Sequence, residues 1–273
     1  MASAAPSHSR SHRWAKRLEG RRALVTGASS GIGVAFAREL AKGGASLVLS
    51  ARRRERLEAL ATELREAHGV EVDIVVADLG EPQGPEAIFA ATEESGKPID
   101  VLINNAGFGT KQPFLDQPID KTAQELQLNL VSLTMLTKRF GVAMRQRGRG
   151  DILNVASVGA YLPTPSMATY GAGKAYVRNF TEALAHELRG TGVHACCLCP
   201  GATETEFADV AGLKLEPWKK LAFMSAERCA QIGLGALFRG RRNIISGFWN
   251  SVAMFSLRFL PRRLSAMLAE RFL

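Results

Sequence analysis

Two side chains that could carry proton chemistry stand four residues apart in the stretch YGAGK, residues 170–174. Residues at positions i and i+4 of a helix lie on one face, so Tyr170 and Lys174 can bracket one ligand. A tyrosine phenol has a pKa of about 10 and is a poor base at neutral pH, but a nearby ammonium group lowers that value. The small residues between them would let a cofactor and neighbouring backbone approach closely, although each glycine costs a helix roughly 1 kcal/mol.

A glycine-rich stretch near the start of the chain could hold phosphate groups. The sequence TGASSGIG, residues 26–33, joins a short apolar run to a helical stretch. Gly27, Gly31 and Gly33 remove side chains where the backbone must turn tightly and approach a ligand. The start of the following helix offers free N–H groups and a positive dipole to a pyrophosphate. At the first strand-to-helix junction of an alternating chain this pattern indicates a dinucleotide site, with an ordinary glycine-rich turn as the alternative.

The end of the second predicted strand indicates which dinucleotide binds. An acid there would hydrogen-bond the ribose 2′-hydroxyl of NAD. The stretch LSARRRER, residues 49–56, has no acid before Glu55 and carries three consecutive arginines from Arg52 onward. A guanidinium group binds a 2′-phosphate through charge-assisted hydrogen bonds, whereas a carboxylate would repel it. The stretch favours NADP(H), with Arg52 as the main contact; the alternative is that the arginines are the solvated start of a helix.

The elements around these stretches alternate between apolar runs and helical patterns. Residues 31–44 carry Phe36 and Leu40 at helical spacing, and residues 52–69 place leucines on one face and charges on the other. Such alternation predicts an α/β fold, a Rossmann-type doubly wound parallel sheet of about seven strands in a single domain, with an extra C-terminal helical segment. The strands are expected at residues 22–27, 45–51, 70–79, 98–107, 150–158, 192–201 and 242–247.

Length and composition bound the organisation of the chain. It has 273 residues, of which 46% are hydrophobic and 22% charged, ordinary values for a soluble globular protein, and a formal net charge of +9. We expect a disordered basic tail at residues 1–19, an NADP-binding catalytic domain at 20–250 and a basic amphipathic helical extension at 251–273. The tail lacks the apolar run of a secretory signal, so we expect a cytoplasmic protein, with a transit peptide as the alternative.

Four cysteines raise the question of a disulfide or a metal. Cys196, Cys197 and Cys199 crowd one strand-like stretch, and Cys229 stands apart. Neighbours so close on a strand cannot easily pair, because disulfide geometry is demanding. A zinc site would need a second cluster of Cys or His at ligand spacing, and only His194 is near. We therefore expect small buried thiols in a reducing compartment, and no metal.

In chain order, these and later motifs resemble those of the short-chain dehydrogenases/reductases. The resemblance covers roughly residues 20–250 and is to the single-domain, non-extended branch, with a looser similarity to 3-ketoacyl and 17β-hydroxysteroid reductases. One position departs from the family, because Gly173 stands where a serine is common before the lysine. The motifs are TGASSGIG at 26–33, NNAG at 104–107, Asn129, Ser157, YGAGK at 170–174 and PGATET at 200–205.

The resemblance implies a catalytic role for four side chains. Tyr170 would be the general acid/base that protonates the nascent alkoxide during reduction, and Lys174 would lower the pKa of the tyrosine and bind the nicotinamide ribose. Ser157, thirteen residues before Tyr170, would hold the substrate carbonyl. Asn129 would support a water-linked proton relay near the lysine. A lone tyrosine is usually a surface or helix-packing residue, but here all four catalytic positions are filled.

The resemblance also implies where NADP(H) lies. Asp78 would contact the adenine, the NNAG segment would line the adenosine side, and the loop at Pro200 would orient the nicotinamide. The expected cofactor-binding residues are Gly27, Ser29, Ser30, Gly31, Ile32, Gly33, Arg52, Asp78, Leu79, Asn105, Ala106, Gly107, Tyr170, Lys174, Pro200, Gly201 and Thr203.

The substrate pocket is expected to be apolar. Specificity in this family lies in the segment after PG, here residues 202–227, which carries six large apolar side chains. Such a lid suggests a lipophilic small-molecule ketone or alcohol, although the side chains could instead pack on the domain. The lid side chains are Phe207, Leu213, Leu215, Trp218, Leu221 and Phe223, and further pocket walls are Phe108, Tyr161, Leu162 and Met167.

The C-terminal stretch is both basic and apolar. Residues 238–273 hold seven arginines and one acid, Glu270. Their apolar run, residues 248–257, is shorter than the about 20 residues that cross a bilayer, and Pro261 separates it from a second, amphipathic helix predicted at residues 262–273. Basic and aromatic residues around apolar helices suit peripheral contact with an anionic membrane, which stays open for the end of the chain. For the first helix, packing on the domain or at a subunit interface, as part of a helical hairpin, is preferred.

Other partners follow from charge pattern and family. Nucleic acid is not expected, because the basic residues are bound up with apolar ones and do not interleave with base-stacking aromatics. The family implies a homodimer or homotetramer formed through the helices that carry Asn129 and Tyr170.

Three functional hypotheses remain open on the sequence. The leading one is an NADP(H)-dependent oxidoreductase that reduces a lipophilic ketone, fatty-acyl or steroid-like, or oxidises the matching alcohol. The second is a broad-range dehydrogenase of small alcohols and ketones. The third is a non-catalytic NADP-sensing regulator, against which the complete set of catalytic residues counts.

Overall fold

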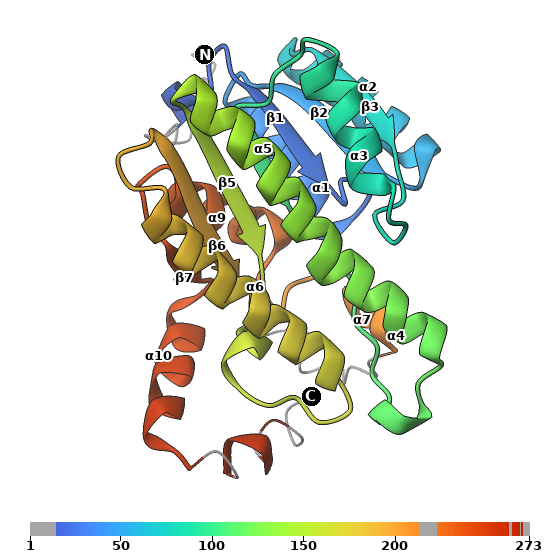
Figure 1. The fold of residues 1–273 in the computed structure, drawn as a ribbon, viewed down its shortest axis with the longest axis vertical. Coiled ribbons are helices and arrows are strands. Elements are labelled where there is room, and N and C mark those ends of the chain that lie inside the picture. The colour runs from blue at the N-terminus through green and yellow to red at the C-terminus, as the bar shows by residue number, and fades with distance from the viewer. Residues whose placement is uncertain (1–14, 213–222, 262–263, 268, 270–273) are drawn as a thin grey trace, which may run out of the picture.

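The computed structural model describes residues 15–212, 223–261, 264–267 and 269. Its strands are β1 (Arg22–Thr26), β2 (Ser46–Ala51), β3 (Val72–Val76), β4 (Val101–Asn104), β5 (Gly150–Val155), β6 (Val193–Cys199) and β7 (Asn243–Ile245). They form one parallel sheet in the order β3-β2-β1-β4-β5-β6-β7 (Figure 1). The central strands β4 and β5 are buried along their whole length, as continuous apolar strands covered on both faces should be.

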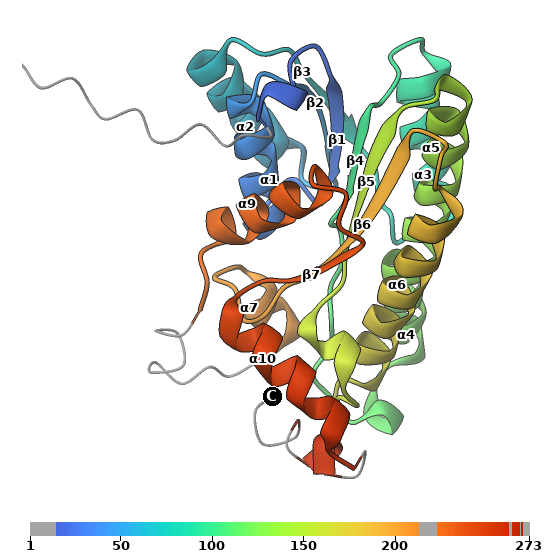
Figure 2. The same ribbon diagram turned by 90° about the vertical axis from the view of Figure 1, so that its left-hand side faces the viewer.

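Helices cover both faces of this sheet. They are α1 (Gly31–Lys42), α2 (Arg54–His68), α3 (Gly84–Phe89), α4 (Ile119–Leu126), α5 (Leu133–Arg147), α6 (Ala168–Glu187), α7 (Phe207–Ala211), α9 (Ala226–Leu237) and α10 (Phe248–Ser256). One core cluster joins the sheet to α1, α2 and α9, and a second joins its other face to α3, α5 and α6 (Figure 2). The predicted single-domain, doubly wound α/β fold is confirmed.

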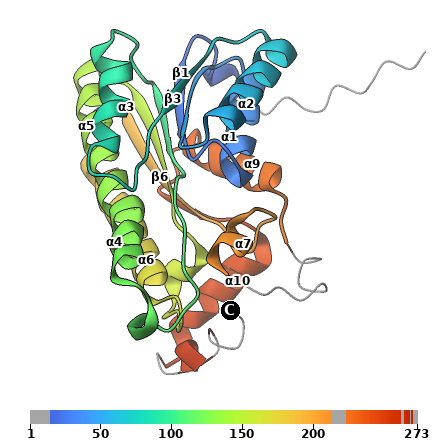
Figure 3. The ribbon, with the colours of Figure 1, turned by 90° about the vertical axis from the view of Figure 1, so that its right-hand side faces the viewer.

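The strand order reverses between β1 and β4, and this reversal positions the site. Strand β1 pairs with β2 on one side and with β4 on the other. In open parallel sheets, ligands bind outside the carboxyl ends of the strands at such a reversal. The glycine-rich loop leaves β1 at this edge, and the NNAG segment leaves β4 there. Figure 3 shows α4, α7 and α10 beyond the same edge.

The sequence at residues 121–148 predicts one long helix, and the structure interrupts it. Helix α4 passes into a π-helical segment, Gln127–Ser132, which continues into α5. Wider turns of this kind are frequent at functional sites, because they change the direction in which side chains project. Asn129 lies in this segment.

The folded chain begins earlier than the predicted boundary at residue 20. A 3-10 helix at Ala15–Arg17 precedes Leu18, whose side chain is fully buried in the core with α1. A Cβ atom on Gly43 would lie 2.5 Å from Leu18 Cδ1, so this end of α1 is shaped around the leucine. Leu18 is therefore part of the core, although the predicted disordered tail, residues 1–19, included it. Residues 1–14 of that tail lie outside the described residues.

The C-terminal helix also begins before its predicted boundary at residue 251. Helix α10 starts at Phe248, directly after Gly247, and continues into a 3-10 turn at Leu257–Phe259. It lies beyond the carboxyl edge of the sheet and below β7 (Figure 1). The second helix predicted near the C-terminus falls largely on residues outside the described ones.

The four cysteines are free and buried, as the sequence indicates for small apolar side chains. The sulfur atoms of Cys197 and Cys199 are 3.8 Å apart, well beyond the about 2 Å of a disulfide. They point from β6 into a small core cluster with Val177 of α6. Their role in the described structure is therefore packing.

Candidate active site

Four side chains that the sequence singles out come together beyond the carboxyl edge of the sheet. Ser157 follows β5, and Asn129 lies in the π-helical segment. Tyr170 and Lys174 stand one turn apart on α6. Helix α6 packs against both the π-helical segment and the 3-10 turn that follows Ser157, so these contacts gather the three elements around one point.

The ammonium group of Lys174 is buried at the end of β5. Its residue is 4% exposed, and Nζ donates a hydrogen bond of 3.0 Å to the backbone oxygen of Val155. Burial disfavours the charged form and lowers the pKa of Lys174 to about 8, although nearby acidic groups oppose this shift. An amine with this pKa can exchange a proton near neutral pH.

The ring of Tyr170 lies 5.2 Å from the ring of Phe207, centroid to centroid, and the hydroxyl group of Tyr170 has that of Ser157 as a neighbour. Burial raises the pKa of Tyr170 to about 12, and the neighbouring Ser157 opposes this rise. This shift runs opposite to the expectation that Lys174 lowers the pKa. The lysine Nζ lies 5.6 Å from the ring centroid, and burial is the largest of the effects on the phenol. The phenol is therefore protonated at neutral pH.

Ser157 is fixed by the turn that it begins. Its Oγ accepts a hydrogen bond of 3.1 Å from the backbone N–H of Gly159 and caps the 3-10 turn Val158–Tyr161. Because the oxygen is the acceptor in that bond, its own proton can be directed to the Tyr170 oxygen or to a ligand. The cap thus orients the hydroxyl without consuming its donor.

The side chain of Asn129 holds a short loop after β4. Its Nδ2 donates to the backbone oxygen of Phe108 at 2.7 Å, and its Oδ1 accepts from the backbone N–H of Phe108 at 3.2 Å. Asn129 is 1% exposed, so water does not compete for these bonds. Both polar ends of the side chain are therefore hydrogen-bonded within the protein. If Asn129 takes part in a proton relay, it does so through its backbone.

The loop held by Asn129, residues 107–110, is called the clamp loop below, and it comes very close to the other side chains of the candidate site. A Cβ atom on Gly107 would lie 2.7 Å from Oδ1 of Asn129 and 3.3 Å from Nζ of Lys174. A Cβ atom on Gly109 would lie 2.8 Å from Cδ2 of Tyr170. Real Cβ atoms do not approach so closely, so the clamp loop needs glycine at both positions.

The predicted phosphate loop is a cradle of backbone groups. Helix α1 begins at Gly31, and the first N–H groups of a helix have no acceptor within it. Gly27 and Gly31 have φ of +66° and +53°, a left-handed conformation that favours glycine. A Cβ atom on Gly33 would lie 2.1 Å from the backbone oxygen of Gly27. This cradle fits a cofactor pyrophosphate, which Ser30 and Ile32 would meet through their backbone.

The arginines after β2 lie on two sides of this cradle. Arg53 reaches the phosphate loop: its Nη2 and Nε lie 3.1 and 3.2 Å from Ser29 Oγ, and its Nη1 donates to Glu206 at 3.0 Å. Arg52 is exposed, with Nη1 3.6 Å from Asp78 Oδ2. The sequence analysis took Arg52 as the main contact among the three arginines and did not name Glu206. No local signal marks Glu206, because it stands 153 positions from Arg53.

The NNAG segment is tied to the end of β1. The hydroxyl of Thr26 accepts hydrogen bonds from the backbone N–H groups of Asn105 and Ala106, at 3.0 and 3.1 Å. The side chain of Asn105 also donates to the backbone oxygen of Thr26 at 3.0 Å. Buried Leu79 is held through its backbone oxygen, which accepts from Ser132 Oγ at 2.6 Å. These bonds keep the expected adenosine-side segments at the edge of the sheet.

The segment from Pro200 to Thr203 is supported by the C-terminal part of the chain. The backbone N–H of Gly201 donates to Ser246 Oγ at 3.2 Å, and Thr203 Oγ1 donates to the backbone oxygen of Gly201 at 3.0 Å. A Cβ atom on Gly201 would lie 2.2 Å from Nδ2 of Asn250, so α10 presses directly on this loop. The loop expected to orient the nicotinamide therefore depends on α10 for its position.

Part of the predicted lid and pocket wall lies beside Tyr170. Phe207 on α7 carries a ring next to that of Tyr170, and Met167 is buried with its Cε close to Gly109. Tyr161 is engaged elsewhere, because its hydroxyl donates to Oδ1 of Asn243 at 3.2 Å. Four predicted lid side chains lie outside the described residues: Leu213, Leu215, Trp218 and Leu221.

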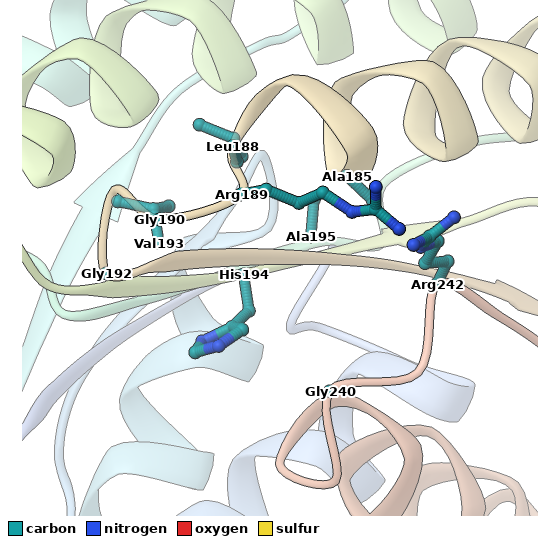
Figure 4. A pocket seen from close by; sticks show the side chains of 10 residues that line it. All are labelled: Ala185, Leu188, Arg189, Gly190, Gly192, Val193, His194, Ala195, Gly240 and Arg242. Atoms are coloured by element: carbon teal, nitrogen blue, oxygen red, sulfur yellow. The ribbon is translucent and has the colours of Figure 1, made fainter.

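A separate cavity of about 260 Å³ lies at the opposite end of the sheet (Figure 4). It borders the start of β6 at Val193, and Arg189 and Arg242 are among the side chains that line it. Parallel sheets of this order bind their ligands at the carboxyl ends of the strands. This cavity is therefore no part of the candidate active site.

Comparisons with known sequences agree with the motif analysis. A family model described as short chain dehydrogenase matches residues 21–216. The chain is 33% identical over 257 residues to hydroxysteroid dehydrogenase-like protein 1 of Gallus gallus, covering 93% of this chain and 76% of that protein. It is 37% identical over 194 residues to very-long-chain 3-oxoacyl-CoA reductase of Anas platyrhynchos, covering 69% of this chain and 62% of that protein. The match thus spans less than two thirds of the duck protein.

Solved structures share the fold over most of its length. A 7beta-hydroxysteroid dehydrogenase, solved in a study of its stereoselectivity, is similar with a TM-score of 0.85 and 28% identity, covering 93% of this chain and 98% of that one. A short-chain dehydrogenase from Sphingobium yanoikuyae, solved in complex with NADPH, is similar with a TM-score of 0.78 and 32% identity, covering 88% and 94% of the two chains.

Replacing Gly107 by alanine should disable the site without unfolding the domain. The new Cβ would push against Asn129 and Lys174, and crowding of this kind typically costs about 1–3 kcal/mol. We expect NADPH binding, measured by titration calorimetry, to weaken about tenfold or more, while the circular dichroism spectrum stays unchanged. Gly141→Ala is the matched control, since its Cβ would meet Ile152 Cδ1 at an ordinary 3.6 Å. Equal NADPH affinity in G107A and the wild type would contradict the tight clamp loop.

Proposed function

The chain belongs to the short-chain dehydrogenase family, and we propose that it is an NADP(H)-dependent reductase of a lipophilic ketone, fatty-acyl or steroid-like, that also oxidises the matching alcohol. Family membership makes it an oxidoreductase that acts on a CH–OH group with a nicotinamide cofactor. The observation that carries the finer proposal is the arrangement of a protonated Tyr170, with the hydroxyl group of Ser157 as its neighbour, one helical turn from a buried Lys174.

The residues of the site divide the work of reduction. When bound, the cofactor supplies a hydride to the carbonyl carbon. The hydroxyl groups of Ser157 and Tyr170 donate hydrogen bonds to the carbonyl oxygen, which orients the substrate and stabilises the negative charge that develops there. The Tyr170 proton passes to that oxygen, and the alcohol is complete. Lys174 titrates near neutral pH and helps to return a proton to the phenol.

The proton affinity of Tyr170 supports the reductive direction. Burial raises its pKa to about 12, so at neutral pH the phenol is ready to act as an acid. Alcohol oxidation needs the phenolate as a base, and burial makes that form costly. We therefore propose that reduction is the favoured direction near neutral pH. The rate of alcohol oxidation is expected to increase as the pH rises.

Charge near the cradle supports NADP(H) over NAD(H). Strand β2 ends at Ala51 without a carboxylate, and Arg52 and Arg53 follow it on either side of the cradle. A guanidinium group can bind a 2′-phosphate with paired, charge-assisted hydrogen bonds. Glu206 holds Arg53 in place, and its own pKa is lowered by its bonds to Arg56 and Arg53.

Apolar side chains near Tyr170 support a lipophilic substrate. Phe207 and the buried Met167 lie beside the phenol, and Phe108 is half-buried on the clamp loop. Pockets lined in this way gain most of their affinity from apolar surface, with a few polar groups to fix orientation. Relatives whose names refer to hydroxysteroids and long-chain 3-oxoacyl-CoA agree with this class of substrate.

We also propose a homodimer or homotetramer built on the helices that carry Asn129 and Tyr170. Large apolar side chains stand exposed along this face, among them Val131, Met135 and Tyr176. A groove between α4 and α6 is lined by Phe114 and Leu126 on one side and by small residues of α6 on the other. Bulky side chains beside a row of small ones suit a symmetric contact with a second copy.

The outer face of α10 supports peripheral contact with an anionic membrane. Phe248, Trp249, Phe255 and Phe259 are each more than half exposed and follow one another at helical spacing. The sequence beyond residue 237 has a single acid, and Arg258 lies over the ring of Phe255. Cationic and aromatic side chains together suit anionic lipid headgroups.

No helix in the described part of the chain is long and apolar enough to cross a bilayer. We propose a cytoplasmic protein that binds the membrane surface from one side.

Tyr170→Phe tests the reaction class. NADPH oxidation by the purified protein should proceed with long-chain 3-oxoacyl thioesters or steroid ketones faster than with short diketones, and should fall about 100-fold or more in the variant, because the proton donor is lost. Tyr176→Phe is the control, since that exposed hydroxyl contacts Thr134 away from the site. Turnover that favours small substrates would indicate the broad-range dehydrogenase. Full activity in Y170F would contradict the mechanism, and NADPH binding without any turnover would favour the regulator.

The cofactor proposal predicts separate effects of the neighbouring arginines. Arg52→Ala and Arg53→Ala should each raise the Kd for NADPH about tenfold and leave the Kd for NADH nearly unchanged, since each variant loses charge-assisted bonds to the 2′-phosphate. Arg54→Ala should change neither value, because Arg54 pairs with Glu58 on the outer face of α2. Fluorescence titration of both cofactors measures this. An equal rise in the Kd for both cofactors would show that these arginines do not recognise the 2′-phosphate.

Vesicle sedimentation tests the outer face of α10. The wild type should bind vesicles that contain phosphatidylglycerol and not vesicles of phosphatidylcholine alone. The double variant F255S/F259S should bind about tenfold more weakly, because it loses apolar surface from the membrane contact. The control L115S/I119S removes equally exposed side chains near α4 and should bind normally. If F255S/F259S changes the molar mass in ultracentrifugation and not vesicle binding, the face is a subunit interface and the membrane proposal fails.

A further inference from the structure

Glu125 is a buried acid that the mechanism described above does not use. It stands on α4, one turn before Asn129, and is 1% exposed. Neither of its carboxylate oxygens has a hydrogen bond of ordinary geometry among the residues that the structure describes. A carboxyl group in such a place costs free energy, and residues that break the rules of burial concentrate at functional sites.

The clamp loop connects this acid to the catalytic side chains. Its successive residues approach Lys174 at Gly107, Asn129 at Phe108 and Tyr170 at Gly109, as described above. The next residue, Thr110, lies against the Glu125 carboxyl group and lowers its pKa through both its side chain and its backbone, although the buried Thr110 hydroxyl has no hydrogen bond of ordinary geometry in the described structure. Helix α4 packs on α6, and the Glu125 carboxyl group acts electrostatically on both Lys174 and Tyr170.

The acidic groups that act on Lys174 are Glu125 and two thiols, and Glu125 is the carboxylic acid among them. Glu125 interacts electrostatically with the exposed Lys121 on its own helix and with Lys174 on α6. Lys174 in turn interacts electrostatically with the thiols of Cys197 and Cys199 on β6 and with Glu125.

The phenol of Tyr170 is surrounded in a similar way. It meets the hydroxyl of Ser157, the carboxyl group of Glu125 and the thiol of Cys199. Among these neighbours of Lys174 and Tyr170 in the described structure, Glu125 is the carboxylic acid.

We propose that Glu125 is a positioning residue whose buried carboxylate keeps Lys174 in its ammonium form and the proton on Tyr170, and so holds the site ready to reduce a carbonyl. A negative charge stabilises a neighbouring cation and disfavours a neighbouring phenolate, so both effects run in the same direction. The inference rests on the catalytic roles proposed for Tyr170 and Lys174, and not on the identity of the substrate.

The direction of the proton affinities agrees with this role. Burial lowers the pKa of Lys174 to about 8, and the Glu125 charge works against that fall. Burial raises the pKa of Tyr170 to about 12, and the Glu125 charge adds to that rise. Burial also raises the pKa of Glu125 itself. Removal of the carboxylate should therefore lower the pKa of both catalytic groups and shift them toward their deprotonated forms.

The test is a titration of Lys174 by NMR in protein labelled at the lysine Cε carbon. The chain has ten lysines, and Lys174→Met identifies the signal of interest. The wild type should titrate near pH 8, and Glu125→Gln should titrate about one pH unit lower. Glu125→Met carries the same prediction and removes the buried polar group altogether, so it serves if the glutamine variant folds poorly. Glu39→Gln, a buried acid on α1 bonded to Gln231, is the control and should leave the midpoint in place.

Kinetics give a second readout. The upper limb of the pH profile of kcat/KM for ketone reduction should move to lower pH in E125Q by the shift seen in the titration. An unchanged Lys174 midpoint in both Glu125 variants would overturn the inference and show Glu125 to be a neutral, structural acid. Because the titration needs no substrate, a failure of the reductase proposal, such as turnover by Y170F, is separable from a failure of this one.

Discussion

The burial of one ammonium group is the constraint on which the rest of the site depends. Lys174 can occupy the interior because the backbone oxygen of Val155, at the end of the central strand β5, accepts its hydrogen bond. A buried cation without such a partner would cost several kcal/mol. A Cβ atom on Gly107 would lie 2.7 Å from Oδ1 of Asn129 and 3.3 Å from the same ammonium nitrogen, so the clamp loop has no room for a side chain there. Burial of this ammonium group therefore requires three features together. They are the order of the strands, the position of α6 and the glycines of the clamp loop.

Much of the fold and the catalytic set could be predicted from the sequence, because the signals are local. Alternating apolar runs and helical patterns indicate a parallel sheet, and the glycines of the phosphate loop mark the junction of β1 and α1. Tyr170 and Lys174 are four residues apart, so a helix alone places them together. Ser157 is detectable through the order of the family motifs, thirteen residues before Tyr170, and the structure places it just after β5, at the edge where such sheets bind ligands.

The features that sequence reasoning missed depend on distant contacts. Arg53 is fixed by Glu206, and Leu18 belongs to the core because α1 folds back against it. The proton affinity of Tyr170 also depends on the whole fold, since burial of the phenol raises its pKa. Glu125 gives no sign in the sequence, because only packing of α4 on α6 and the clamp loop makes it a buried acid.

The most direct test of the account is the fate of the hydride. NADPH that carries deuterium at the transferable position should yield an alcohol with one deuterium on the former carbonyl carbon, detected by mass spectrometry of the product from a long-chain or steroid ketone. The oxygen proton should come from solvent by way of Tyr170, and the labelled alcohol should disappear in the Tyr170→Phe variant. Product without deuterium, or equal labelling by the variant, would contradict the assignment of this site as the place where hydride and proton meet.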